Sequence, residues 1–187
     1  MSRERVLLLG GAWGAGLFVA VFLANDAVKP GYEPARDLVS EAAIGAGGWV
    51  QVVNFVVAGG LLAGSSFALS RVVGRWTGIL VRVVGAGLVA AGVFVSDPVP
   101  QERVSWHGVI HNVVSVAVFS ALSAACFTAA CWRATTAWRW YCRVVGVAVP
   151  VLFVTTGAVT NSGGVWQRLT IVAGWSWLVV LNLRAAR

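Results

Sequence analysis

The chain alternates long apolar stretches with short polar segments, and six such stretches occur along its 187 residues. The hydrocarbon core of a bilayer is about 30 Å thick and takes roughly 20 helical residues to cross. A membrane-spanning strand needs only about ten residues, so the lengths favour helices over a barrel. The pattern predicts an all-α, polytopic membrane bundle that forms one domain over residues 1–187. We expect its six transmembrane helices at residues 6–24, 48–69, 79–95, 108–130, 144–159 and 169–183.

Basic residues lie mainly at one set of span ends, and this asymmetry predicts the orientation in the membrane. One side carries Arg3, Arg5, Arg71, Arg75, Arg82, Arg133, Arg139, Arg143, Arg184 and Arg187. The other side carries only Lys29, Arg36, Arg103 and Arg168. Because positive residues concentrate in cytoplasmic segments, we expect both termini in the cytoplasm.

Composition narrows the class of protein further. Hydrophobic residues make up 58% of the chain and charged residues 11%, whereas soluble domains average about 25% charged residues. The net charge of +7 would suit nucleic acid, but the positive residues are dispersed at the ends of apolar stretches and form no basic stripe. We therefore expect a membrane partner and no nucleic acid. The excess of arginine over lysine is typical of GC-rich bacteria, so the expected location is the bacterial inner membrane.

One internal similarity bears on the architecture. Residues 14–28 (GAGLFVAVFLANDAV) align without gaps on residues 85–99 (GAGLVAAGVFVSDPV), which places Asp26 on Asp97. Two helices per unit would make the bundle three repeated hairpins. Chance similarity between apolar sequences is the alternative interpretation.

The acidic residues and histidines lie on the side opposite to most arginines. Six of the seven acids fall there: Asp26, Glu33, Asp37, Glu41, Asp97 and Glu102. His107 and His111 lie on the same side. Ionisable groups at membrane depth are costly unless paired or solvated, so they usually face a cavity or the bundle interior. The sequence therefore predicts a polar site that faces the outside.

The first part of that site is a carboxylate followed by two histidines. A proline-containing turn brings Asp97 back towards a helix on which His107, His111 and Ser115 share one face. Two histidines at this spacing suit a divalent metal such as zinc, with Asp97 as a third ligand. Metal-free acid–base chemistry by the same residues is a second interpretation. Plain hydrogen bonding and helix capping are a third.

The second part lies between the first two spans. Asp37, Ser40 and Glu41 share one face of a helical turn that begins near Pro34. With the first part, these residues form the set of candidate catalytic side chains. That set is Asp37, Ser40, Glu41, Asp97, His107 and His111.

The candidate substrate-binding residues are aromatic or polar and lie near the outer membrane boundary. They are Trp49, Asn54, Trp106, Asn112, Trp166 and Arg168. An aromatic face stabilises a cation by roughly 0.5–2 kcal/mol, and Arg168 would bind an anionic head group. Three other tryptophans, Trp13, Trp175 and Trp177, lie deeper and are expected to line a cavity.

The order of these elements resembles a known family. They read Pro34-x-Arg36-Asp37-x-x-Ser40-Glu41, then Asp97-Pro98, then Trp106-His107-Gly-x-x-His111-Asn112. Together they resemble the uncharacterised bacterial six-helix membrane family filed as domain of unknown function 998, over nearly the whole chain. The resemblance implies a single six-helix domain with these residues at its centre, and it supplies no activity.

Two more distant comparisons concern chemistry. A Ser, Asp and His set at helix ends is similar to the alkaline ceramidase and adiponectin-receptor superfamily of zinc hydrolases, which has seven helices and three histidines. Small membrane-bound terpene cyclases protonate an isoprenoid with a carboxylic acid among aromatic rings. Asp97 or Glu41 would be that acid here, beside Trp49, Trp106 and Trp166.

The sequence therefore favours an enzyme that acts on a lipid or isoprenoid entering sideways from the bilayer. The reaction would be acid-initiated terpene cyclisation or metal-assisted lipid hydrolysis, with His107 and His111 as ligands or proton carriers. The alternative is a proton-coupled carrier or a non-catalytic small-molecule-binding membrane subunit. The sequence assigns no oligomeric state.

Overall fold

The computed structural model describes residues 2–99, 103–133, 135–159 and 161–187, and within these ranges every regular element is helical. Six α-helices and one 3₁₀ turn follow one another along the chain. They are α1 (Arg3–Val28), η1 (Glu41–Ala43), α2 (Trp49–Val72), α3 (Arg75–Val93), α4 (Trp106–Ala129), α5 (Thr136–Ala158) and α6 (Gly163–Ala185). The all-α fold predicted from the apolar pattern is thus confirmed. The last two helices begin earlier than predicted, and α3 ends before Val95.

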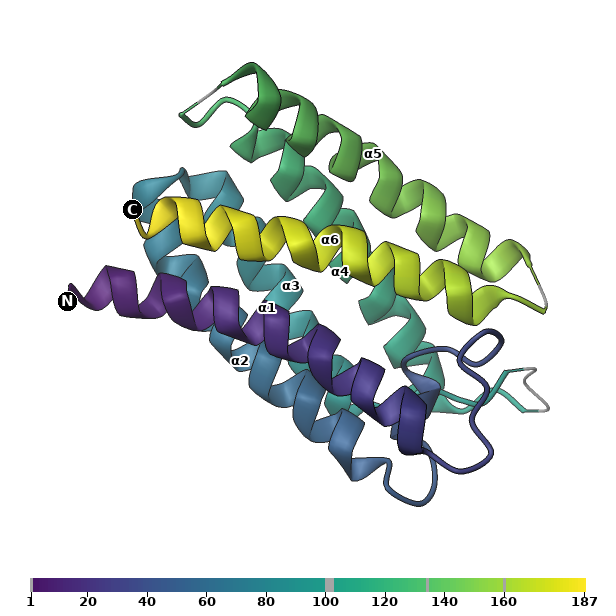
Figure 1. The fold of residues 1–187 in the computed structure, drawn as a ribbon. Coiled ribbons are helices and arrows are strands. Elements are labelled where there is room, and N and C mark those ends of the chain that lie inside the picture. The colour runs from purple at the N-terminus through teal and green to yellow at the C-terminus, as the bar shows by residue number, and fades with distance from the viewer. Residues whose placement is uncertain (1, 100–102, 134, 160) are drawn as a thin grey trace.

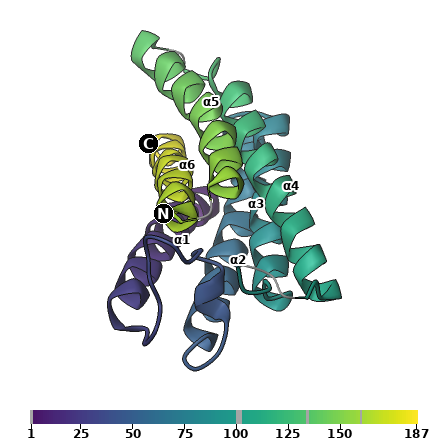
Figure 2. The ribbon, with the colours of Figure 1, turned by 90° about the vertical axis from the view of Figure 1, so that its right-hand side faces the viewer.

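The helices form a closed ring in chain order. Each packs against its neighbours in sequence, and α6 closes the ring by packing on α1. The two termini lie at the same end of the bundle (Figure 1). The segment 29–48 lies together with residues 94–99 and 103–105, the described part of segment 94–105, at the opposite end, which we call the loop end (Figures 1 and 2). The candidate catalytic residues all belong to the loop end or to the adjoining turn of α4.

Aromatic side chains fill the centre of the ring. Phe18 of α1 stacks on Trp175 of α6, with ring centroids 5.2 Å apart, and both are fully buried. On the other side, α2 and α3 approach closely because glycines face each other. A Cβ on Gly59 would stand 2.6 Å from the carbonyl oxygen of Gly85, so a larger residue there would push the two helices apart.

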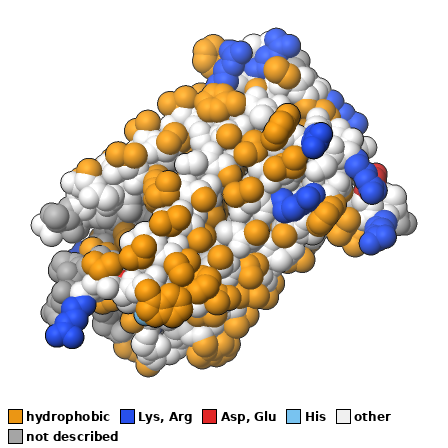
Figure 3. All heavy atoms as spheres, turned by 180° about the vertical axis from the view of Figure 1, so that it is seen from behind, with side chains coloured by type: hydrophobic (Ala, Val, Ile, Leu, Met, Phe, Trp, Pro, Cys, Tyr) orange, Lys and Arg blue, Asp and Glu red, His pale blue; other side chains and the backbone are white. Residues whose placement is uncertain are grey.

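The outer surface of the bundle is largely apolar. Among the described residues, five helices (α1 to α5) are long and apolar enough to cross a membrane. Hydrophobic side chains are spread over the back of the molecule, and most of the Lys and Arg side chains in that view lie towards the end that holds the termini (Figure 3). These helices indicate a multi-pass membrane protein. Helix α6 is of similar length but carries Gln167, Arg168 and Asn182 among its apolar residues.

A proline shapes the contact between α4 and α5. Pro150 lies inside α5 and cannot donate to the carbonyl of Gly146, one turn earlier. The Ser123 hydroxyl of α4 donates to that carbonyl instead, at 2.6 Å, so the freed acceptor is satisfied. A Cβ on Gly146 would also stand only 3.0 Å from the Phe127 ring. The two helices are therefore joined closely at this level.

Candidate functional site

Asp97 caps the start of α4. Its Oδ2 accepts a hydrogen bond from the Ser105 amide at 2.9 Å, and its Oδ1 accepts one from the Ser105 hydroxyl at 2.5 Å. Ser105 in turn accepts from the Gly108 amide at 3.0 Å, as a helix N-cap does. A Cβ at Gly108 would overlap the Asp97 carboxylate, which explains why glycine follows His107. The bonds from Ser105, its hydroxyl first, hold the pKa of Asp97 below its usual range.

Both histidines bond to the end of α3. His107 Nδ1 lies 2.8 Å from the Val95 carbonyl oxygen, and His111 Nδ1 lies 2.8 Å from the Phe94 carbonyl oxygen. A carbonyl oxygen only accepts, so each Nδ1 carries the proton and each Nε2 is the acceptor of the neutral ring. His111 is buried, whereas His107 is half-exposed. The tautomer of His111 is therefore fixed by the backbone of the neighbouring helix.

These bonds bear on the metal site expected from Asp97, His107 and His111. Among the described residues, no group of three His, Cys, Asp or Glu side chains is placed to hold a metal ion. The Nδ1 bonds to carbonyls do not themselves oppose metal binding, because a histidine that binds a metal commonly donates its other N–H to a carbonyl; the placement of the three side chains decides the matter. The geometry therefore does not assemble a three-ligand zinc site from these residues.

The acids of segment 29–48 hold the loops together. Glu41 accepts from the Leu38 amide at 2.6 Å and from the Val99 amide at 2.7 Å, so it ties segment 29–48 to segment 94–105. Burial raises the pKa of Glu41, against the opposing effect of these two backbone bonds. Asp37 accepts from the Glu33 amide at 2.8 Å and pairs with Arg36 at 2.9 Å. Both carboxylates therefore support the loop backbone.

Arg168 joins three elements at the loop end. Its Nε and one Nη bond to both oxygens of Asp26 at 2.9 and 2.7 Å, and Tyr32 accepts from the same Nη at 2.7 Å. The other Nη bonds to the carbonyls of Asp37 and Gly164. All five N–H groups of the guanidinium are thus used within the protein. Burial raises the pKa of Tyr32 to about 12, so its hydroxyl stays neutral.

This network was not anticipated from the sequence. The sequence predicts an anionic head group as the partner of Arg168, and it places Asp26 among the outer acids and opposite Asp97 in the internal similarity, without pairing it with Arg168. The Arg168 and Asp26 side chains are 13% and 10% exposed, so the pair is largely removed from solvent. The aligned acids also differ in setting, because Asp26 lies within α1 and Asp97 lies beyond the end of α3.

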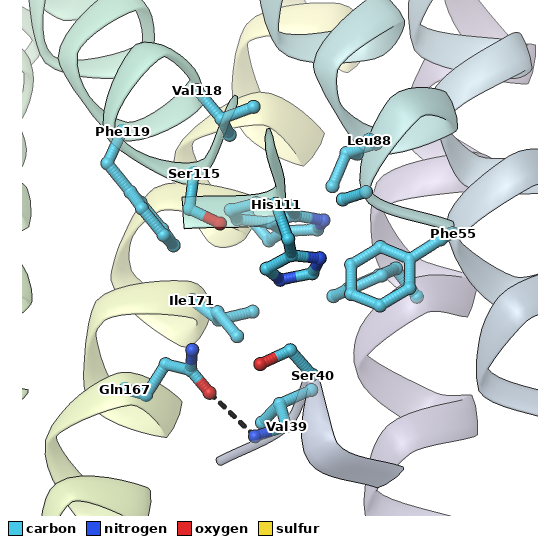
Figure 4. A pocket seen from close by; sticks show the side chains of 13 residues that line it. Val39, Ser40, Phe55, Leu88, His111, Ser115, Val118, Phe119, Gln167 and Ile171 are labelled. Carbon is cyan, nitrogen blue, oxygen red and sulfur yellow. Dashed lines mark hydrogen bonds between the residues drawn. The ribbon is translucent and has the colours of Figure 1, made fainter. Parts of the chain in front are cut away.

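A small cavity with apolar walls and a few polar side chains lies below these loops. It measures about 30 Å³, and its polar lining comprises Ser40, His111, Ser115, Gln167 and Trp175. The side chains of Ser40, His111, Ser115 and Gln167 turn towards this common space (Figure 4). Gln167 accepts from the Val39 amide at 2.6 Å, which fixes the backbone next to Ser40. Of the predicted catalytic set, the cavity brings together only Ser40 and His111.

A groove between α4 and α5 lies next to this cavity. It measures about 340 Å³, and it shares Ser40, His111, Ser115 and Gln167 with the cavity. The rest of its wall is mostly apolar and includes Leu38, Val116, Phe153, Val154 and Gly157. It opens on the apolar surface, towards the loop end from the Ser123–Gly146 contact. His111 therefore lines both the cavity and a groove with a mostly apolar wall.

A second groove has a wholly apolar lining, unlike the α4–α5 groove. It lies between α1 and α6, measures about 420 Å³, and is lined by apolar residues that include Leu9, Leu17 and Val179. Trp13 lines this groove and is 75% exposed. Trp175 lines the cavity below the loops, as predicted, whereas Trp177 is buried and donates to Cys142 at 3.3 Å.

The remaining predicted binding residues are dispersed. Trp49 and Trp106 are each 70% exposed, and Trp166 is half-buried. Asn54 is buried and donates to the Phe18 carbonyl at 3.1 Å. Asn112 lines the α4–α5 groove. Glu102 falls outside the described residues.

Sequence reasoning gave too little weight to Gln167 and Ser115. Ser115 continues the face of His107 and His111, so helical spacing was a usable signal. Gln167 had no such signal, because its partner Val39 lies 128 residues away.

Comparisons with known proteins identify the family but no activity. No curated protein and no solved structure matches this chain. The model of one family, described as protein of unknown function (DUF998), matches residues 12–184, which include every residue named above for the loops, the cavity and the α4–α5 groove. The chain therefore belongs to the DUF998 family.

Proposed function

We propose that this protein is a membrane-embedded enzyme acting on a lipid or isoprenoid that enters sideways between α4 and α5. The observation that carries the proposal is the shared lining of groove and cavity, which links an apolar surface to His111. Ligand sites of this kind combine an apolar wall with a few converging polar groups. The polar end of the substrate would lie at His111 and Ser40, with its chain in the groove.

The chemistry best supported is metal-free proton transfer by His111. Its Nδ1–H is held by the Phe94 carbonyl, so Nε2 is the nitrogen that takes a proton from the substrate. The Ser40 hydroxyl would bond to the reacting group in the same cavity. Acid-initiated cyclisation by Asp97 is less well supported, because its lowered pKa keeps that carboxyl ionised. Glu41 is also poorly suited as the acid, since both of its oxygens accept backbone bonds.

The orientation belongs to the same proposal. All six helices would span a bacterial inner membrane, with both termini in the cytoplasm and the loop end outside. The support is the excess of arginines on the side of the termini. The cavity would then lie in the outer leaflet.

A lipid-binding subunit without catalysis is the second candidate. It is favoured by one observation: Asp37, Glu41 and Asp97 all bond to the loops. The two candidates differ in whether a bound lipid is converted.

The experiment compares the wild type with His111→Ala in bilayer discs made from total lipid of the producing cells. Mass spectrometry of the lipids before and after incubation measures conversion. The wild type should consume one lipid species, and His111→Ala should lose that activity. Val113→Ala is the control, because Val113 is on the same helix and 64% exposed. Undiminished conversion by His111→Ala would remove the catalytic proposal, and no conversion by the wild type would favour the binding subunit.

A further inference from the structure

The polar groups of the cavity are neutral. Ser40 and Ser115 supply hydroxyls, and His111 supplies an acceptor nitrogen. Gln167 uses its oxygen on the Val39 amide, so its NH₂ group is the end that remains for a ligand (Figure 4). The cavity therefore offers several donors and one strong acceptor.

Trp175 adds a donor that the protein itself does not satisfy. The residue is 1% exposed and lines the cavity. Its Nε1–H is buried and has no hydrogen-bond partner among the described residues. An unsatisfied buried donor is energetically unfavourable, so a ligand acceptor at this place would relieve an existing penalty.

The site lacks a counter-charge for an anionic ligand. None of the described residues that line the cavity or the groove is Asp, Glu, Lys or Arg. The nearest cation in sequence is Arg168, next to Gln167, and its guanidinium is fully bonded to Asp26, Tyr32 and two carbonyls. Burying an ionised phosphate without a paired cation is strongly unfavourable. Phosphate and diphosphate ends are therefore poor ligands here.

The cavity also limits the size of the polar end. Its volume of about 30 Å³ is about two to three times the roughly 10–15 Å³ that a cavity needs to hold one water molecule. A single hydroxyl fits this space, whereas a bulky head group does not. The apolar groove of about 340 Å³ is left for the chain.

We infer that the ligand is an uncharged lipid alcohol, with one hydroxyl in the cavity and a prenyl or alkyl chain in the α4–α5 groove. A hydroxyl both accepts and donates, so it matches the unsatisfied donor of Trp175 and the acceptor nitrogen of His111, which line the same cavity. This inference rests on the site of the proposed function and names the substrate class for it. It requires binding of the alcohol, whether or not the alcohol is then converted.

The test measures binding of tritiated farnesol to the full-length protein in bilayer discs by scintillation proximity. Farnesol should bind saturably, and unlabelled farnesol should displace it, while farnesyl diphosphate should not. Trp175→Phe keeps the ring against Phe18 but removes the N–H. It should weaken binding about 2- to 10-fold, the effect of one hydrogen bond of about 0.5–1.5 kcal/mol.

Trp177→Phe is the matched control. It removes the N–H of another buried tryptophan, whose partner is Cys142 outside the cavity, and it should leave farnesol affinity unchanged. Thermal unfolding of both variants verifies that they fold. A wild type without saturable farnesol binding would overturn the inference, as would equal displacement by the diphosphate or an unchanged affinity in a folded Trp175→Phe protein. Lipid conversion lost in His111→Ala would still stand in those cases, so the two proposals fail separately.

Discussion

The loop end and the cavity beneath it use polar residues in opposite ways. At the loop end, Asp26, Asp97 and Arg168 are charged and bonded to neighbouring groups of the protein. In the cavity, the polar residues are neutral, and Trp175 keeps an unsatisfied donor. Charged side chains therefore stabilise the loop end, which we call the frame, while the side chains that line the cavity and the α4–α5 groove are uncharged. Substitutions in the frame should therefore change stability, and substitutions in the cavity should change binding.

The largest effect on stability is expected from Asp26→Asn. The change leaves the buried Arg168 guanidinium without its counter-charge, which costs about 3–5 kcal/mol for a buried pair. The free energy of unfolding, measured by SDS titration in mixed micelles, reports the loss. Glu33→Gln is the control, since its pair with Arg36 is exposed and long at 3.7 Å, and such pairs contribute about 0–1 kcal/mol. Equal losses in the two variants would break the distinction between frame and surface.

A smaller loss is expected from Gly108→Ala. The new methyl group would displace the Asp97 carboxylate from the start of α4, and overpacking of this kind costs about 1–3 kcal/mol. The same titration measures it. In the Asp97→Ala background the clash is gone, so Gly108→Ala should then cost much less. Additive losses in the double variant would contradict the assigned contact.

Ser123→Ala tests the contact that bounds the groove between α4 and α5. It leaves the Gly146 carbonyl without a donor, at a cost of about 1 kcal/mol. Pro150→Ala restores a backbone N–H for that carbonyl, so Ser123→Ala should have little effect in the Pro150→Ala background. A loss of the same size in both backgrounds would show that the hydroxyl acts in another way.

The smallest effect on stability is expected from Asp97→Asn, and only at acidic pH. Because hydrogen bonds lower the pKa of Asp97 below its ordinary value of 3.8, the folded state binds this proton less readily than the unfolded state. Stability from Asp97 is therefore present above that value and lost as the pH falls through the folded pKa. Melting temperatures between pH 3 and pH 6 should show a steeper acid decline for the wild type than for Asp97→Asn. Parallel curves would contradict the assignment.

Glu41 should change the pH dependence of the melting temperature in the direction opposite to Asp97. Burial raises its pKa above the ordinary value of 4.5, so the folded state holds this proton more readily than the unfolded state. Its contribution is present below the ordinary pKa and lost as the pH rises through the raised one. The wild type should therefore lose stability as the pH rises towards 6, and Glu41→Gln should not show this loss. A change of the same sign as in Asp97→Asn would break the comparison.

The helices could be predicted from the sequence because membrane helices depend on local apolar length. Residues 6–24 and 48–69 fall in α1 and α2 with shifts only at their ends. The one-sided gathering of acids was also readable, and those described lie at the loop end. The roles of the polar side chains could not be predicted, because their hydrogen-bond partners are backbone amides far away in the sequence. Glu41 accepts from the Val99 amide, and Gln167 accepts from the Val39 amide.

The residues of the cavity could also be predicted only in part. Ser115 and His111 share a helical face, and this spacing was visible. Trp175 was placed correctly by its depth, whereas Trp13, at a similar depth, faces the apolar surface. Depth along a helix follows from sequence, but the direction of a side chain depends on how the ring of helices closes.

The central claim is that the α4–α5 groove leads a lipid to His111. The most direct test is photo-cross-linking of the protein in bilayer discs with a prenyl alcohol that carries a diazirine in its chain. Mass spectrometry of the peptides should locate adducts on Val116, Phe153 or Val154, and an excess of farnesol should suppress them. Labelling confined to the larger α1–α6 groove around Leu9 and Trp13, or equal in the two grooves, would contradict the account.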